Sequence, residues 1–242
     1  KGVSASLSSS RKRAAGTEVD VTEQDIPFPI VSTVILVSMI PIGFLLWDFQ
    51  RGTDIHQHAF ALTTISVLFI LIAGLVIASV CGYMAGLIGA SNSPISSVGI
   101  IAVIASALLI AAFTAGTDAS ASSLVAYTLF TAAIVFGIAT ISNDNLQDLK
   151  TGQLVGATPW KQQVALVIGV VFGSLVIPPV LQLMLTGFGF DGMEGAGPDA
   201  LAAPQAVLMS SVATGIFDDR LDAACRRIAQ THDCKAHGPF SL

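Results

Sequence analysis

The stretch "CGYMAGLIGASNSPISSVGI" (residues 81–100) interrupts the most hydrophobic part of the chain, which extends from about residue 59 to residue 115. The interruption consists of one proline and four small polar residues, namely Pro94, Asn92, Ser93, Ser96 and Ser97. Pro94 has no N–H, and its ring clashes with the preceding helical turn, so it ends or bends a helix. In hydrocarbon, an unpaired backbone polar group is costly, so such a break is tolerated only where protein or water surrounds it.

Two interpretations of this segment are open. Residues 81–97 form either a broken or re-entrant helix at membrane depth or an ordinary loop between two spans. Met84, Leu87 and Ile88 are too apolar for a plain solvated loop, which favours the broken helix. On that interpretation the polar side chains line a transport route and two further residues shape the backbone; the candidates are Asn92, Ser93, Ser96, Pro94 and Gly89.

The composition of the whole chain places it in a membrane. Of its 242 residues, 53% are hydrophobic and only 11% are charged, and the mean hydropathy is +0.76. Soluble domains are about a quarter charged. The only basic cluster is at residues 11–13 and there is no phosphate-binding loop, so neither nucleic-acid binding nor an ATP-driven motor is supported.

The apolar runs predict an all-α, polytopic transmembrane helix bundle with five to six spans and a broken or re-entrant segment. A helix of roughly 20 residues crosses the hydrocarbon core. Runs of this kind occupy residues 29–47, 59–80, 98–115, 124–141 and 164–185, with a marginal sixth at 201–217. Pro41 is expected to bend the first span, and Pro178 with Pro179 to bend or break the fifth.

The polar parts of the chain predict its organisation. Residues 1–25 are expected to form a flexible polar tail or loop, and residues 26–217 the membrane region. Residues 218–242 change abruptly to a charged composition, which indicates either a natural soluble tail or a frameshift or truncation. The chain starts with Lys1, which suggests part of a longer polypeptide. The Lys and Arg distribution places residues 1–25 and 142–163 in the cytoplasm.

A second polar stretch, "SNDNLQDLKTGQLVGATPWKQQ" (residues 142–163), follows the fourth span. Its candidates for a gate or a cation-binding patch are Asn143, Asp144, Asp148 and Lys150. Asp144 and Asp148 share one face of a helix. Gly152 followed by Pro159 predicts a helix stop, a turn and a new helix at Trp160. The alternative, a solvated linker whose lysines set the topology, is the one that spacing alone favours.

The remaining motifs predict structure more than chemistry. His56 and His58 are expected at the surface and not in a metal site. The GxxxG pairs Gly82–Gly86 and Gly169–Gly173 predict close helix packing. The sequence shows neither HExxH nor GxSxG and no facing pair of intramembrane carboxylates, so an enzyme, a metal centre and a bound cofactor are not expected.

Taken together, the NSPIS motif and the DLKTG…TPWKQQ motif, separated by two spans, resemble the oligopeptide transporter (OPT) family. The chain looks closest to its prokaryotic members, which are related to the yellow stripe-like metal–chelate carriers. The resemblance covers residues 27–217. It implies a proton-coupled secondary importer of small peptides or metal–chelate complexes that works by alternating access, of which this chain would be a fragment.

The resemblance also implies partners and a location. The partners would be a small peptide or metal–chelate substrate, protons, the lipid bilayer and the remaining half of the transporter, with no nucleic acid. The protein would be integral to a membrane, here the prokaryotic plasma membrane. The rival hypotheses are a non-transporting membrane scaffold or assembly subunit, and a channel.

Overall fold

The computed structural model describes residues 20–89, 94–115, 117, 119–190 and 200–229. In chain order its elements are η1 (Val21–Glu23), α2 (Phe28–Phe49), η2 (Asp54–His58), α3 (Ala59–Ile88), α4 (Ile95–Phe113), α5 (Ala121–Val155), α6 (Pro159–Gly187) and α7 (Pro204–Ala229). Five helices, α2 to α6, are long and apolar enough to cross a membrane. The prediction of an all-α, polytopic helix bundle is therefore confirmed.

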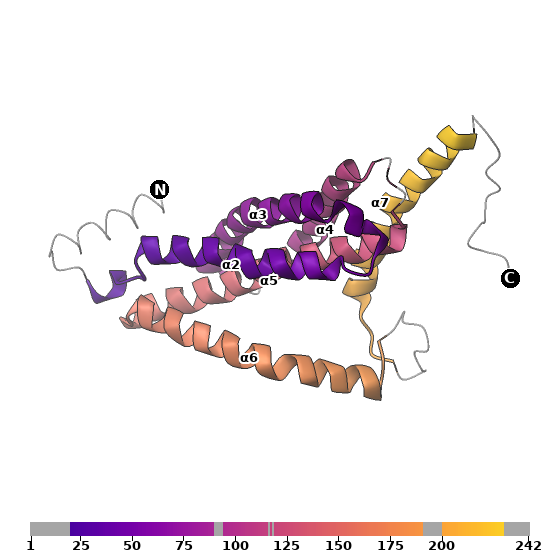
Figure 1. Ribbon diagram of the computed structural model, residues 1–242. Helices are drawn as coiled ribbons and strands as arrows, with labels where there is room; N and C mark the ends of the chain where they lie inside the picture. The colour runs from indigo at the N-terminus through magenta and orange to yellow at the C-terminus, as the bar shows by residue number, and fades with distance from the viewer. Residues whose placement is uncertain (1–19, 90–93, 116, 118, 191–199, 230–242) are drawn as a thin grey trace.

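Helix α5 is the centre of the bundle (Figure 1). It contacts α3, α4, α6 and α7, and it also meets α2, whose Phe49 ring stacks on Phe130 at 4.9 Å between centroids. Helix α6 diverges from the bundle, and α7 crosses the bundle obliquely. At 35 residues, α5 is about 52 Å long, well beyond the roughly 30 Å of a hydrocarbon core.

Small residues allow the bundle helices to pack closely. One face of α4 is buried and made mostly of such residues: Gly99, Ala102, Val103, Ser106, Ala107, Ile110 and Ala111. Gly99 lies against the Phe136 ring of α5, and Gly82 of α3 lies against Ser142 and Leu146 of α5. Gly86, the second glycine of that GxxxG pair, has open space around it. One glycine of the motif therefore makes the predicted close contact with α5.

Contacts between side chains fix the register of the bundle. The Ser142 hydroxyl of α5 donates to the carbonyl of Ala78 in α3 at 2.7 Å. Nearer the start of both helices, the Tyr127 hydroxyl of α5 donates to Ser66 Oγ of α3 at 3.1 Å. Residue numbers rise together in both helices, so α3 and α5 run parallel. Helix α4 runs in the opposite direction and packs mainly against α5, with Gly99 beside Phe136.

The break between α3 and α4 is shorter than the sequence predicts. Residues 81–88 were expected to belong to a separate broken segment, but they continue α3, because their apolar side chains suit a longer helix. The interruption is confined to residues 89–94, with Gly89 at φ +86° and Pro94 as the N-cap of α4. Asn92 and Ser93 lie outside the described residues.

The two ends of this break lie at different depths. Helix α3 passes the level of Leu146 at Gly82 and continues for six more residues. Helix α4 begins four residues before Gly99, which lies beside Phe136, and thus near the level of Ile141. The two levels differ by about eleven residues of α5, so at 1.5 Å per residue α4 begins about 16 Å deeper in the bundle than α3 ends. The break is therefore set into one end of the bundle.

Prolines inside two helices do not interrupt them. Helix α2 continues through Pro41, and α6 continues through Pro178 and Pro179, so the fifth span is not broken there. Each proline removes one backbone hydrogen bond, and the bonds on either side hold the helix together. Helix α7 likewise continues through the composition change at Asp218 as far as Ala229.

Candidate functional site

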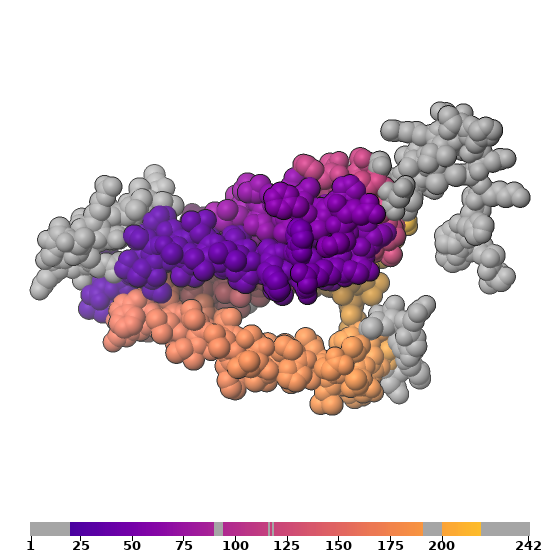
Figure 2. All heavy atoms as spheres, in the orientation of Figure 1, coloured from indigo at the N-terminus to yellow at the C-terminus, as the bar shows by residue number. Residues whose placement is uncertain are grey.

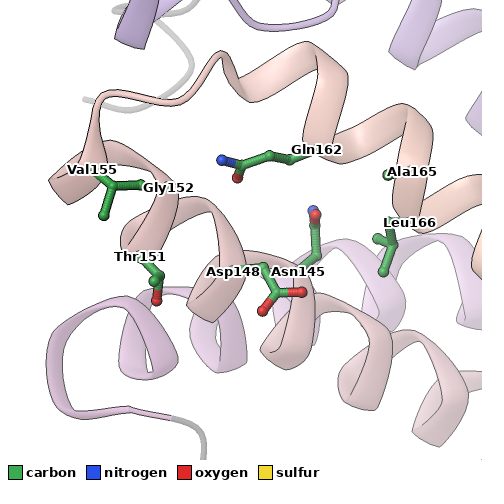
Figure 3. A pocket seen from close by; sticks show the side chains of 8 residues that line it. All are labelled: Asn145, Asp148, Thr151, Gly152, Val155, Gln162, Ala165 and Leu166. Carbon is green, nitrogen blue, oxygen red and sulfur yellow. The ribbon is translucent and has the colours of Figure 1, made fainter.

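A cleft of about 540 Å³ lies between the end of α5 and the start of α6 (Figure 3). Its lining combines polar side chains with apolar walls: Asn145, Asp148, Thr151, Gly152, Val155, Gln162, Ala165 and Leu166. Asn145 and Asp148 come from α5, and the Gln162 side chain reaches across from α6 (Figure 3). The polar part of the cleft is thus built by two helices that are neighbours in sequence.

A tight corner at residues 156–158 creates this arrangement. Gly156 adopts the left-handed conformation at φ +76°, and the Ala157 N–H donates to the Gly152 carbonyl at 2.8 Å, which closes α5. Pro159 then occupies the first position of α6, where its missing N–H costs nothing. The sequence predicted the turn and the new helix correctly but placed the stop at Gly152, which remains inside α5.

The Gln162 side chain packs directly against Gly152. A Cβ added to Gly152 would overlap the Gln162 amide, so the absence of a side chain there lets Gln162 lie against α5. The Gln162 Oε1 atom is buried and has no hydrogen-bond partner within the described part of the chain. A buried acceptor without a donor is costly, and a ligand with N–H groups would satisfy it.

The polar run of α5 lies beside apolar segments of its neighbours. Asn145 and Asp148 share the cleft with Ala165 and Leu166, where α6 has already become apolar. On the other side, α3 is predominantly apolar through residues 81–88, alongside the same turns of α5. A carboxylate beside apolar side chains needs water or a partner, and Asp148 is exposed in the cleft, where water can reach it.

The four predicted residues of α5 do not form one site. Asp148 lines the cleft, and Asp144, one turn earlier on the same face, is exposed. Lys150 is 160° away from Asp148 around the helix, at 100° per residue, and its Nζ donates to Gln153 at 3.0 Å. Asn143 is buried, with its Oδ1 unpaired among the described residues.

Three lining residues, Asn145, Thr151 and Gln162, were not selected as candidates from sequence. Asn145 and Thr151 have a signal, because they lie three residues before and after Asp148 and thus on its side of a helix. Gln162 has none in the local pattern. Its position follows from the corner at Gly156, which folds α6 back onto α5.

The interrupted segment shows less of a site in the described residues. Pro94 and Ser96 are exposed, and Gly89 supplies the positive φ with which α3 ends. Asn92 and Ser93 cannot be placed against them, because residues 90–93 are outside the described ranges. Their role as cavity-lining residues remains a prediction.

The segment before α2 forms hydrogen bonds with the start of α6, next to the α5–α6 corner. The Trp160 N–H donates to the Gln24 carbonyl at 3.0 Å, and the Ile26 N–H donates to Gln163 Oε1 at 3.2 Å. Gln163 Nε2 in turn donates to Asp25 Oδ1 at 3.3 Å. These bonds place the start of α2 and the α5–α6 corner at the same end of the bundle, as the predicted topology requires.

The histidines lie at the opposite end of the bundle. His56 and His58 are both exposed in η2, as expected, and the His56 ring meets the Trp47 ring edge-on at 5.9 Å. Within the described ranges, there is no group of three or more His, Cys, Asp or Glu side chains that could hold a metal ion.

The substitution Gly152→Ala tests the contact between Gly152 and Gln162. We expect the new methyl group to displace the Gln162 amide and to lower the free energy of unfolding by about 1 kcal/mol, since overpacking a close contact is destabilising. In a Gln162→Ala background the same substitution should cost little, because the displaced atoms are gone. Detergent titrations of the unchanged chain, the two single variants and the double variant measure the loss of unfolding free energy caused by Gly152→Ala with and without Gln162. Equal losses in the two backgrounds would refute the contact.

The sequence of this chain is similar to a known family and to two known proteins. The family model described as "OPT oligopeptide transporter protein" matches residues 1–230. The chain is 42% identical over 216 residues to "Putative oligopeptide transporter" of Haemophilus influenzae, a match that covers 85% of this chain and 33% of that protein. It is 35% identical over 97 residues to "Probable metal-nicotianamine transporter YSL10" of Oryza sativa, covering 38% of this chain and 14% of the other.

No solved structure matches the chain. The chain spans about a third of the length of the Haemophilus influenzae relative. The family match covers all five helices that could cross a membrane as well as both polar stretches. The chain is an integral membrane protein and belongs to the OPT oligopeptide transporter family.

Proposed function

We propose that this chain forms part of a secondary active transporter and that the cleft between α5 and α6 is part of its substrate route. The observation that carries the proposal is the position of Asp148, which lines the cleft together with Ala165 and Leu166, where α6 has become apolar. Polar and charged residues within a membrane are expensive and commonly mark a transport pathway.

The chemistry of the cleft favours a positively charged amino group as the part of the substrate bound there. Asp148 offers a carboxylate, and Gln162 Oε1 offers a buried acceptor that has no donor among the described residues. Asp148 forms no ion pair with a cation among the described residues. Val155, Ala165 and Leu166 add apolar walls that suit a small side chain.

Both substrate classes suggested by the relatives carry amino N–H groups, and at the free end of a peptide the amino group is a positively charged ammonium. One relative is named for oligopeptides and the other for metal–nicotianamine. The free amino end of a peptide, or an amino group of an organic chelator, would donate to Asp148 and Gln162. Charge-assisted hydrogen bonds of this kind are among the stronger ones in proteins.

The arrangement also suggests how access alternates. Helix α6 contacts α5 and the segment before α2, and these contacts gather at the corner. Rotation of α6 about the corner would open or close the cleft. We place this end in the cytoplasm because it carries Lys150 and Lys161, in a prokaryotic plasma membrane whose proton gradient drives uptake.

The test uses a joined carrier, in which this chain replaces the matching residues of the Haemophilus influenzae relative. In proteoliposomes with an inward proton gradient, we expect saturable uptake of a labelled tripeptide or of iron–nicotianamine. The N-acetylated tripeptide is the matched control, and we expect at least about tenfold slower uptake because it lacks the ammonium group.

Each other outcome contradicts one part of the proposal. Equal uptake of the free and acetylated peptides would exclude recognition of the amino group. Uptake that is independent of the gradient would exclude proton coupling, and uptake that does not saturate would indicate a channel. A well-folded joined carrier that moves neither substrate would favour the scaffold hypothesis.

A further inference from the structure

Helix α6 has an apolar surface that the described chain leaves uncovered. None of its 18-residue apolar window is buried, whereas 39% of the corresponding window is buried in α4 and in α5. The space-filling view shows α6 standing apart from the bundle beyond the corner (Figure 2). A wedge-shaped gap, hereafter the α5–α6 wedge, therefore opens from the cleft along the two helices.

Small residues lie on both walls of this wedge. On α6, Gly169 follows Ala165 of the cleft by one turn, and Gly173 follows Gly169 by another. On α5, Gly137 lies two turns before Asn145 of the cleft on the same side of the helix. A Cβ added to Gly137 or Gly169 would meet nothing within 4 Å, and one on Gly173 would meet Ile177 of α6 itself.

We propose that a transmembrane helix from the remaining length of the carrier packs into the α5–α6 wedge, against Gly169 and Gly173. The length of the matched relative indicates the source of this helix. The match covers 33% of that protein, so about two thirds of its length lies outside the region that this chain covers. Glycines spaced four apart let two helix backbones approach closely in a membrane.

A helix fits this surface better than lipid does. The narrow end of the wedge, at the cleft, carries the exposed carboxylate of Asp148, which hydrocarbon tails cannot solvate. Lipid tails gain little from flat glycine surfaces, whereas a neighbouring helix gains close van der Waals contact there. The incoming helix would also cover the cleft and separate it from the bilayer.

The test is an assembly experiment that does not depend on transport. This chain, tagged, is co-expressed with the part of the Haemophilus influenzae relative outside the match, and the captured amount of that part is measured after solubilisation. We expect capture by the unchanged chain, and about tenfold less by a Gly169→Leu, Gly173→Leu double variant, equivalent to about 1.4 kcal/mol. The control, Val167→Leu with Val171→Leu, changes the opposite face of α6 and should capture normally.

The glycine substitutions should not disturb the fold of this chain. Gly169 has open space around it, and a Cβ on Gly173 would make only an ordinary contact with Ile177 of its own helix, so leucines there should leave the chain folded, which size-exclusion chromatography checks. Equal capture by the glycine variant and the control would mean that lipid covers this face. No capture by the unchanged chain, or capture of a second copy in its place, would also overturn the proposal.

Discussion

Asp148→Asn is expected to slow peptide uptake by the joined carrier at least about tenfold, since one charge-assisted hydrogen bond of roughly 1.5–3 kcal/mol is lost. The amide keeps the size of the side chain and removes the charge that would bind an ammonium group in the cleft. Because the residue is exposed in a cleft and not packed in the core, the substitution should leave stability nearly unchanged. Initial rates in proteoliposomes at saturating and subsaturating peptide measure the effect.

Lys150→Gln supplies the matched control on the same helix. Lys150 is only two residues from Asp148, but it points to the other side of α5 and bonds to Gln153. We expect its uptake rate to stay within about twofold of the unchanged carrier, as usual for surface substitutions. If the two variants transport equally well, Asp148 does not contact the substrate and the cleft is not the route.

Gly82→Ala is expected to lower the free energy of unfolding more than any other substitution considered, by about 1–3 kcal/mol. The added methyl group overpacks a close contact between α3 and α5 that leaves no space for it. The added Cβ would lie 2.9 Å from Leu146 Cγ and 3.0 Å from Ser142 Oγ. Leu146 Cγ is not the free end of its side chain, so it can move away only if α3 and α5 separate. That movement would also strain the hydrogen bond from Ser142 to Ala78.

The second glycine of the same motif provides the comparison. Gly86 has open space around it, so Gly86→Ala should be neutral or slightly stabilising, because alanine favours the helix. Detergent titration of both variants, followed by tryptophan fluorescence, measures the two free energies of unfolding. Equal effects at both positions would show that α3 and α5 do not pack in the register described.

Hydrophobicity predicts the number and order of the membrane helices well, because each span must present an apolar surface about 20 residues long. It predicts their ends less well. Residues 81–88 and 142–155 extend α3 and α5 past the expected spans, since nothing in their composition forbids a helix. Pro178 and Pro179 signal a break that does not occur, because flanking backbone bonds keep α6 continuous.

The cleft depends on contacts that no local pattern contains. Asp148 stands out as a charged residue beside a span, and its spacing from Asn145 and Thr151 predicts a shared face. Gln162 enters the site only because Gly156 turns the chain and Gly152 leaves room for the amide. Periodicity describes one helix at a time, so a site shared between two helices requires the fold itself.

The proposed substrate route requires the polar run of α5 to lie inside the bilayer and to meet water there. Spin labels on single cysteines at Asn145 and at Val164 test it in lipid nanodiscs, with the native cysteines replaced by alanine. We predict that the Asn145 label is reached by a water-soluble nickel complex and that the Val164 label is reached mainly by oxygen dissolved in lipid. Nickel access to both labels would place this whole level of the protein in bulk water and contradict the account.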